Sequence, residues 1–236
     1  MKHSFRRRQN VPRLAAVLIA ITLRLVGHDL LAEEKPSAPA PAAASTNGWV
    51  SLFDGKSLRG WTRTDFSTLG EVKVESPFRG GPGAIVVAMA EELNGVTCTR
   101  PVPKTNYEVS LDAMRLDGND FFCGLTFPVG DLAASLIVGG WGGSVVGISS
   151  IDGVDASAND TTKSLDFDKN RWYRIRVRVT PAKIECWIDD KQVVDAAIPG
   201  HKIGLRPGEI ERSLPFGIAA WQTRAAWREI KLRRLP

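Results

Sequence analysis

From Trp49 to the C-terminus, apolar and polar residues alternate with a period of two, in short runs separated by Gly, Pro, Asn and Asp. This period is typical of strands with one buried face, and no window of twelve residues shows the stripe of an amphipathic helix. The pattern predicts strands at 49–53, 71–75, 84–90, 95–100, 107–116, 120–127, 132–138, 144–149, 171–179, 183–189, 192–196, 216–223 and 227–235. So many short strands need a closed barrel or two stacked sheets, and we expect an all-β, two-sheet antiparallel jelly-roll sandwich.

Residues 171–189 predict a hairpin in detail. RWYRIRVRV and KIECWID each alternate between an apolar face and a face of charged residues and tryptophan. The outer face would pair the arginines at 174, 176 and 178 with acids across the strands. We interpret this arginine row as a solvated or paired sheet face rather than as a site for an anionic ligand.

The positive charge is concentrated at the N-terminus. The chain has 236 residues and a formal net charge of +5, but residues 1–32 hold six basic side chains and a single acid, so the rest is close to neutral. An electrostatic case for nucleic acid as a partner therefore disappears. The same segment has a basic start, an apolar run at 14–23 and a small residue, Ala32, before two glutamates, as secretory signal peptides do. The run is shorter than the ~20 residues that span a bilayer, so we expect cleavage near Ala32, a secreted or periplasmic protein and no stable membrane insertion.

A Pro/Ala-rich stretch at 33–47 is expected to be a disordered linker before a domain at 48–236. His201 is then the only histidine of the mature chain, which excludes sites that need two, such as HExxH zinc centres. The cysteines at 98, 123 and 186 each share a face with apolar neighbours, which favours buried small hydrophobes. One internal disulfide and a reactive thiol are the alternatives.

Four glycines surround Trp141 in the stretch GGWGG at 139–143. The spacing fits neither GxGxxG nor GxxxxGK[ST] and no helix follows, so we exclude a nucleotide site. Two interpretations stay open. The glycines make a tight turn with positive φ, or they hold the Trp141 indole as a platform that stacks on a sugar. Trp187, on the outer face of the hairpin, is a second candidate for stacking.

Candidates for acid–base chemistry come from separate segments. DFFCGLTF puts Asp120 and Phe122 on one face and Phe121 with Cys123 on the other, which we expect to be the core. Asp120 would then face a groove or solvent, where a carboxylate can act as acid or base beside a second group. We expect catalytic roles for Asp120, Asp152 and His201, with Glu209 as a further possible partner, against the ordinary alternative of solvated or ion-paired side chains.

The loop at 150–162 is rich in oxygen ligands. Its Asp and Asn side chains suit turns, and the same oxygens suit a hard cation such as calcium, although the spacing is not that of an EF-hand. The candidate ligands for calcium or another divalent cation are Asp152, Asp155, Asn159 and Asp160. The sequence indicates no other cofactor.

Two stretches, WVSLFDGKSLRGW at 49–61 and PFGIAAWQTRAAWREIKLRRL at 215–235, are similar to the opening LFDGKSLxGW and closing FRNIxIRxL signatures of the 3-keto-disaccharide hydrolase family. GNDFFCGLTF at 118–127 stands where that family has GNSGIxFR. Asn119 therefore carries over as a candidate for substrate binding, Asp120 replaces a serine and the arginine is missing. The resemblance covers most of 48–236 and implies a concanavalin A-like or LamG-like fold that binds carbohydrate.

The resemblance also implies an activity, which is hydrolase or lyase cleavage of 3-keto-glycosides. A carboxylate or His201 would take the acidic proton beside the ketone, and a divalent cation would polarise that ketone. A non-catalytic carbohydrate-binding module, using Trp141 and Trp187, is the alternative function. An envelope interaction domain is a third.

Overall fold

The computed structural model describes residues 48–68 and 70–236, which form an all-β sandwich of two antiparallel sheets. The predictions of a signal peptide at 1–32 and a linker at 33–47 lie outside the described residues. Within those residues, no helix is long and apolar enough to cross a membrane. The two-sheet architecture expected from the period-two pattern is confirmed.

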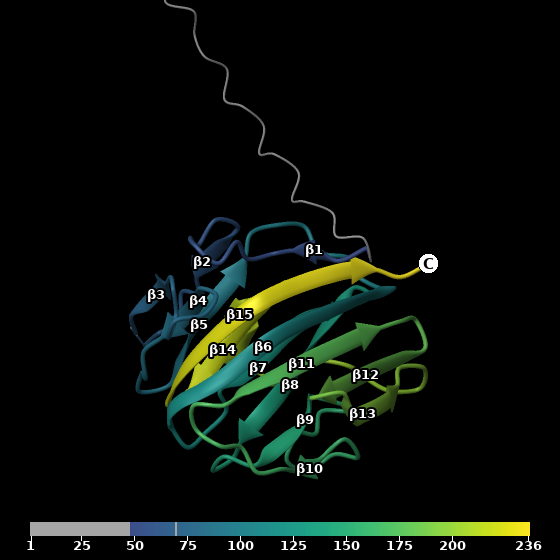
Figure 1. Ribbon diagram of the computed structural model, residues 1–236. Helices are drawn as coiled ribbons and strands as arrows, with labels where there is room; N and C mark the ends of the chain where they lie inside the picture. The colour runs from purple at the N-terminus through teal and green to yellow at the C-terminus, as the bar shows by residue number, and fades with distance from the viewer. Residues whose placement is uncertain (1–47, 69) are drawn as a thin grey trace, which may run out of the picture. The chain divides into compact units, whose positions relative to one another are not determined.

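In the described part of the chain, the two layers, sheet A and sheet B, have eight and seven strands. In order across sheet A lie β13 (Lys191–Ala197), β12 (Lys183–Ile188), β11 (Trp172–Val179), β6 (Tyr107–Gly118), β15 (Thr223–Arg234), β4 (Ala84–Val87) and β3 (Val72–Glu75), and β1 (Val50–Ser51) also pairs with β15. Sheet B runs β10 (Lys163–Ser164), β9 (Val145–Ser149), β8 (Leu132–Gly140), β7 (Cys123–Val129), β14 (Gly217–Trp221), β5 (Leu93–Cys98) and β2 (Trp61–Arg63). Figure 1 shows β15, in yellow, running alongside β6.

Every run predicted as a strand overlaps one in the structure. The additional elements are the short strands β2 and β10 and a 3-10 turn, η1 (Glu209–Ser213). Strands of two or three residues are too short for a period to show in the sequence.

The core lies between the sheets, and buried polar tips of aromatic side chains connect the two layers. Trp227 of β15 is fully buried, and its Nε1–H donates to the carbonyl oxygen of Phe122 at 2.8 Å. Tyr107 of β6 donates its hydroxyl to the carbonyl oxygen of Pro128 on β7 at 2.6 Å. Each bond satisfies a polar group that would otherwise be stranded in an apolar interior. The relative placement of the two sheets is fixed by these bonds as well as by apolar contact.

The cysteines behave as small hydrophobes. Cys98, Cys123 and Cys186 are buried and free, so the favoured interpretation is confirmed and no disulfide joins them. Burial raises the pKa of each thiol, which lowers its reactivity.

The predicted hairpin is formed by β11 and β12. Val177 lies opposite Cys186 and Arg178 opposite Glu185, and this last pair is joined at 3.5 Å. The expected arginine–acid pairing is confirmed for Arg178. The stronger acidic partners of the row, Glu108 and Asp112, lie on the neighbouring strand β6, which the sequence did not reveal.

Candidate functional site

A hollow of about 400 Å³ opens on the outer face of sheet B. Its floor comes from strand residues that alternate with core residues, such as Ser135 and Ile137 on either side of the buried Leu136. One wall is the segment that leads into η1, and the GGWGG turn contributes Trp141 to the rim. The lining residues are Glu92, Leu93, Asp120, Phe121, Ser135, Ile137, Trp141, Ser149, Arg206, Pro207, Glu209, Ile210 and Trp221.

The glycine-rich stretch is a turn between β8 and β9 that carries Trp141 at the rim. Trp141 itself has a φ of 48°, and its residue surface is 41% exposed. A left-handed conformation is costly for a bulky residue and persists only where the surroundings impose it. Gly139 and Gly143, with φ of 77° and 113°, accept that geometry without strain. The turn interpretation is thus confirmed, and the indole it exposes leaves the platform interpretation open.

Arg115 of β6 holds this turn from beneath. Its residue surface is only 5% exposed, and one terminal nitrogen donates to the carbonyl oxygens of Gly143, Gly139 and Asp120 at 2.9, 3.1 and 3.2 Å. The guanidinium also lies over the Phe122 ring at 5.1 Å. Burial lowers the pKa of Arg115, and the nearby Asp120 carboxylate opposes that effect. A single side chain from sheet A therefore fixes both the Trp141 turn and the Asp120 backbone of sheet B.

Asp120 lines the hollow, as predicted, although the strand alternation proposed for its neighbours is wrong. β7 begins only at Cys123, so the chain around Asp120 is a bend in which Phe122 enters the core and Phe121 lines the hollow. The Asp120 Oδ1 accepts the Phe121 N–H at 2.7 Å and Oδ2 accepts the Gly142 N–H at 3.3 Å. The carboxylate is held by the turn that also carries Trp141.

Two more acidic residues line the hollow. Glu209, considered as a partner from sequence, accepts the Ser67 N–H at 2.6 Å and pairs with Arg212 at 3.2 Å. The Ser67 bond, more than Arg212, lowers the pKa of Glu209. Glu92 was not predicted from the sequence, and its carboxylate accepts no hydrogen bond from any residue of 48–68 or 70–236. It lies directly before β5, and a charged residue before a strand does not by itself indicate a binding site.

The wall of the hollow is anchored at both ends. The backbones of Ser150 and Gly204 exchange hydrogen bonds of 2.6 and 3.1 Å, and Arg212 donates to the carbonyl oxygen of Asp65 at 2.9 Å. Between these anchors Arg206 lines the hollow and pairs with Asp155 at 3.2 Å. The wall is thus built by long-range contacts that no sequence period predicts.

Asp152 and His201 come together, but at a second hollow of about 340 Å³. His201 Nδ1 lies 2.8 Å from Asp152 Oδ2, and the Lys202 N–H donates to Oδ1 at 2.7 Å. The hydrogen bond to His201 is the main cause of a lowered pKa for Asp152. The predicted catalytic set is therefore divided, because Asp120 belongs to the first hollow and the other two residues to the second.

Three of the four predicted calcium ligands, Asp152, Asn159 and Asp160, line the second hollow together with His201. Residues 48–68 and 70–236 contain no group of three or more His, Cys, Asp or Glu side chains placed to hold an ion. The Asp155 carboxylate instead accepts the Ser149 hydroxyl at 2.7 Å and pairs with Arg206. The Asn159 side chain donates to two carbonyl oxygens, and its Oδ1 accepts a hydrogen bond from the Thr161 hydroxyl. Asp160 is exposed. The turn-forming alternative accounts for these side chains.

The remaining candidates for sugar binding lie elsewhere. Trp187 is on the outer face of sheet A beneath the guanidinium of Arg176, which is 3.9 Å from the ring centroid. Asn119 is exposed beside the GGWGG turn and is not part of the lining. Trp221 does line the hollow, and the alternation in FGIAAWQT carried a signal for it, since Ile218 and Ala220 are core and Trp221 faces outward.

The chain is similar in sequence to one protein family and in structure to several solved proteins. A family model described as the 3-keto-alpha-glucoside-1,2-lyase-like domain matches residues 48–233. No curated protein matches the chain. Among solved structures, the Crh5 transglycosylase in complex with NAG is similar with a TM-score of 0.51 and 12% identity, covering 83% of this chain and 86% of that one. A Bacillus subtilis protein with a galectin-like fold has a TM-score of 0.50 and 10% identity, covering 75% and 90%. At these identities the structural likeness shows the fold alone.

Proposed function

Because the chain belongs to the family of 3-keto-alpha-glucoside-1,2-lyase-like domains, we propose that the hollow beside Trp141 binds and cleaves glycosides oxidised at the 3-position. The observation that carries the proposal is that Trp141, whose residue surface is 41% exposed, lines one hollow of about 400 Å³ together with the acidic residues Asp120 and Glu92. That volume suits a small ligand. The apolar face of a pyranose can stack on the indole, while its hydroxyls donate to the carboxylates.

The chemistry needs two proton transfers. A ketone at carbon 3 acidifies the hydrogen on carbon 2, and a carboxylate takes that proton. The electron pair then forms the double bond between carbons 1 and 2 as the bond from carbon 1 to the leaving oxygen breaks. The leaving oxygen takes a proton from a second group. Water added across the double bond completes a hydrolysis, and without that step the reaction is a lyase reaction.

Asp120 is our candidate for the base, because two backbone N–H groups fix its carboxylate at the rim of the hollow. Glu92 is the candidate for the second transfer, because it lines the same hollow and its carboxylate makes no bond to the described residues. Asp152 and His201 line a different hollow, so the proposal gives them no role in the reaction.

The test is turnover of 3-keto-trehalose by the full chain, followed as release of glucose and of the 3-keto product. We expect Asp120→Asn to lower kcat by roughly 100-fold or more, as loss of a general base does. Asp166→Asn removes a charge from an exposed loop residue and should leave kcat unchanged. An unchanged kcat in Asp120→Asn contradicts the assignment of the base.

A non-catalytic carbohydrate-binding module is the second candidate function. It is favoured because Asp152 and His201, two of the three residues expected from sequence to be catalytic, line the second hollow and not the first. Sugar binding without turnover, lost in Trp141→Ala, would select it. An interaction domain would show neither binding nor turnover. We also propose export of the chain, which rests on the character of residues 1–32 and is tested by finding the protein outside the cytoplasm with a new N-terminus near residue 33.

A further inference from the structure

Strand β6 is flanked on the outer face of sheet A by cations on both sides. Arg174, Arg176 and Arg178 of β11 lie opposite Asp112, Ser110 and Glu108 of β6. Arg228, Lys231 and Arg233 of β15 lie opposite the same three residues from the other side. Successive rungs are two residues apart, or roughly 6.7 Å, and the two flanking strands are roughly 10 Å apart. The result is two parallel lines of positive charge along an extended strand, which we call the cation track.

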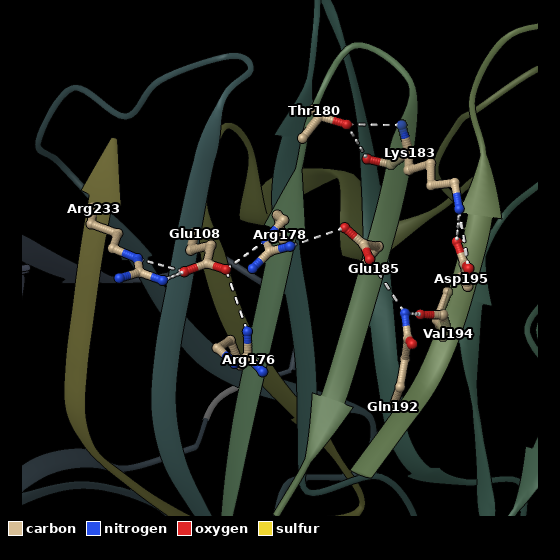
Figure 2. A network of polar contacts seen from close by, with 10 residues as sticks. All are labelled: Glu108, Arg176, Arg178, Thr180, Lys183, Glu185, Gln192, Val194, Asp195 and Arg233. Carbon is tan, nitrogen blue, oxygen red and sulfur yellow. Dashed lines mark hydrogen bonds and ion pairs between the residues drawn. The ribbon is translucent and has the colours of Figure 1, made fainter. Parts of the chain in front are cut away.

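The carboxylates within the track are buried and organise it. The Glu108 side chain is 0% exposed, and Figure 2 shows Arg176, Arg178 and Arg233 converging on it. Arg178 donates to Glu108 at 2.6 Å and Arg176 at 3.3 Å. Burial alone would raise the pKa of Glu108, but hydrogen bonds from Arg178 and Arg233 outweigh it and leave the pKa lowered. Glu108 is therefore ionised at neutral pH and lies too deep to repel a ligand at the surface by contact.

The cations outnumber the acids that they contact. Asp112, with a side chain 7% exposed, takes Arg174 at 3.1 Å and Arg228 at 3.4 Å. Among the described residues outside the track, only Glu185 and Glu229 form ion pairs with its cations. Each guanidinium has five N–H donors, so a single carboxylate cannot occupy those of two or three arginines. The Arg174 side chain is 61% exposed, which leaves its remaining donors facing solvent.

Aromatic rings hold these guanidinium groups in place. The Arg176 guanidinium lies 3.9 Å from the centroid of the Trp187 ring, and that of Arg228 lies 4.1 Å from Trp172. Stacking of this kind fixes a planar cation before a ligand arrives and lowers the entropy lost on binding. Trp187, a candidate for sugar stacking from sequence, is covered by arginine and serves the track instead.

We propose that the cation track binds a linear polysaccharide whose sugar residues carry carboxylate groups. Arginine forks match carboxylates in a bidentate geometry, and two parallel lines of cations suit an extended chain with recurring charge. The site is distinct from the hollow of sheet B and does not depend on the function proposed for it.

Other anionic partners fit the track less well. An extended acidic peptide gains affinity by adding a strand to a sheet edge, but β6 is paired on both sides and offers no edge. A membrane surface needs apolar side chains that insert beside the cations. The large apolar side chains that are exposed among the described residues are Met89, Leu132, Trp141, Val154 and Leu214, and none belongs to β6, β11 or β15.

The experiment is titration calorimetry of the full chain with polygalacturonate at low ionic strength, with dextran as the uncharged polymer. The test variant is Arg174→Gln with Arg176→Gln, because Arg178 and Arg233 still hold Glu108 and Arg228 still holds Asp112. We expect binding to polygalacturonate, none to dextran, and a dissociation constant roughly tenfold higher in the variant, since two charge-assisted contacts are lost. Arg174→Lys with Arg176→Lys keeps the charge and should recover part of the affinity.

The matched control is Arg63→Gln with Lys163→Gln, which removes the same charge from exposed positions of sheet B. The control should bind like the unmodified chain, and thermal unfolding of both variants checks that they fold. Equal losses in the two double variants would mean attraction by net charge alone and would overturn the proposal. Absence of binding to polygalacturonate, or stronger binding to anionic vesicles than to polygalacturonate, would overturn it as well.

Discussion

Replacing Arg115 tests whether its hydrogen bonds hold the Trp141 turn and the Asp120 backbone at the hollow. Arg115→Met keeps a side chain of similar length and removes the donors to the carbonyl oxygens of Gly139 and Gly143, both of which are buried. Each buried carbonyl left without its partner costs about 1–3 kcal/mol. The variant no longer buries a charged guanidinium, whose desolvation is evident in its lowered pKa, and this offsets part of the loss. We expect the free energy of unfolding to fall by roughly 2–4 kcal/mol.

Urea unfolding measures that loss, and amide hydrogen exchange locates it. The Gly142 N–H donates to Asp120 and the Gly143 N–H to the carbonyl oxygen of Gly140, so both amides should exchange faster than the global loss explains. If Arg115 acts by positioning Trp141, Arg115→Met alone should lower the affinity for sugar. The double variant Arg115→Met with Trp141→Ala should then lose little more affinity than Trp141→Ala alone. Uniform destabilisation with unchanged protection of Gly142 and Gly143, or additive losses of affinity, would refute the reasoning.

Glu108→Gln should lower the free energy of unfolding at pH 7 by roughly 2–4 kcal/mol, because a buried partner of three arginines loses its charge. The folded pKa of Glu108 lies below its ordinary value of 4.5, so the ionised carboxylate stabilises the fold above that value. Urea titrations should therefore show that the difference in unfolding free energy between the unmodified chain and Glu108→Gln vanishes as the pH falls through the folded pKa. Gly139→Ala should lower the free energy of unfolding by about 1–3 kcal/mol in the same urea titration, because its φ is +77° and the new Cβ would clash with Arg115 Nη2. Gly153→Ala also has a positive φ but lies in open space, so it should lower the free energy of unfolding less. Native Cys98, Cys123 and Cys186 should not react with a thiol reagent until the chain unfolds, and rapid labelling of the native protein would contradict their burial.

The period of two predicted the layers because burial of one face imposes alternation wherever strands are regular. It failed where the backbone departs from a regular strand. Around Asp120 a bend carries Phe121 and Phe122 to opposite sides from those expected. In β15 a bulge at Glu229, with a φ of 53°, lets Arg228 and Lys231 share the outer face although they are three residues apart. An alternation read from the sequence assigns those two cations to different faces, so the cation track could not be seen.

The lining residues of the hollow were predicted only in part, because only some of them carry a local signal in the sequence. Trp141 was found because four glycines around a tryptophan are a local signal, and Asp120 because a charged residue opens an apolar run. Glu92 and Arg206 join them only through contacts between distant segments. Arg115 left a weak sign, since it stands at the core parity of β6 after Leu111 and Ala113. A charged residue at a core position calls for buried partners, here carbonyl oxygens of the opposite sheet.

Net charge conceals how this chain distributes its charges. After residue 32 the basic and acidic residues balance, which argued against nucleic acid as a partner. The structure separates them: cations predominate around β6 on sheet A, while Glu92, Asp120 and Glu209 face the hollow of sheet B beside Arg206. Sheets pack about 10 Å apart, and side chains on the two outer faces add to that separation, whereas salt screens exposed charges over about 8–10 Å. Each face therefore presents its own field to a ligand. An uncharged sugar in the hollow and a carboxylated chain along β6 can then be bound by one small domain without either site opposing the other.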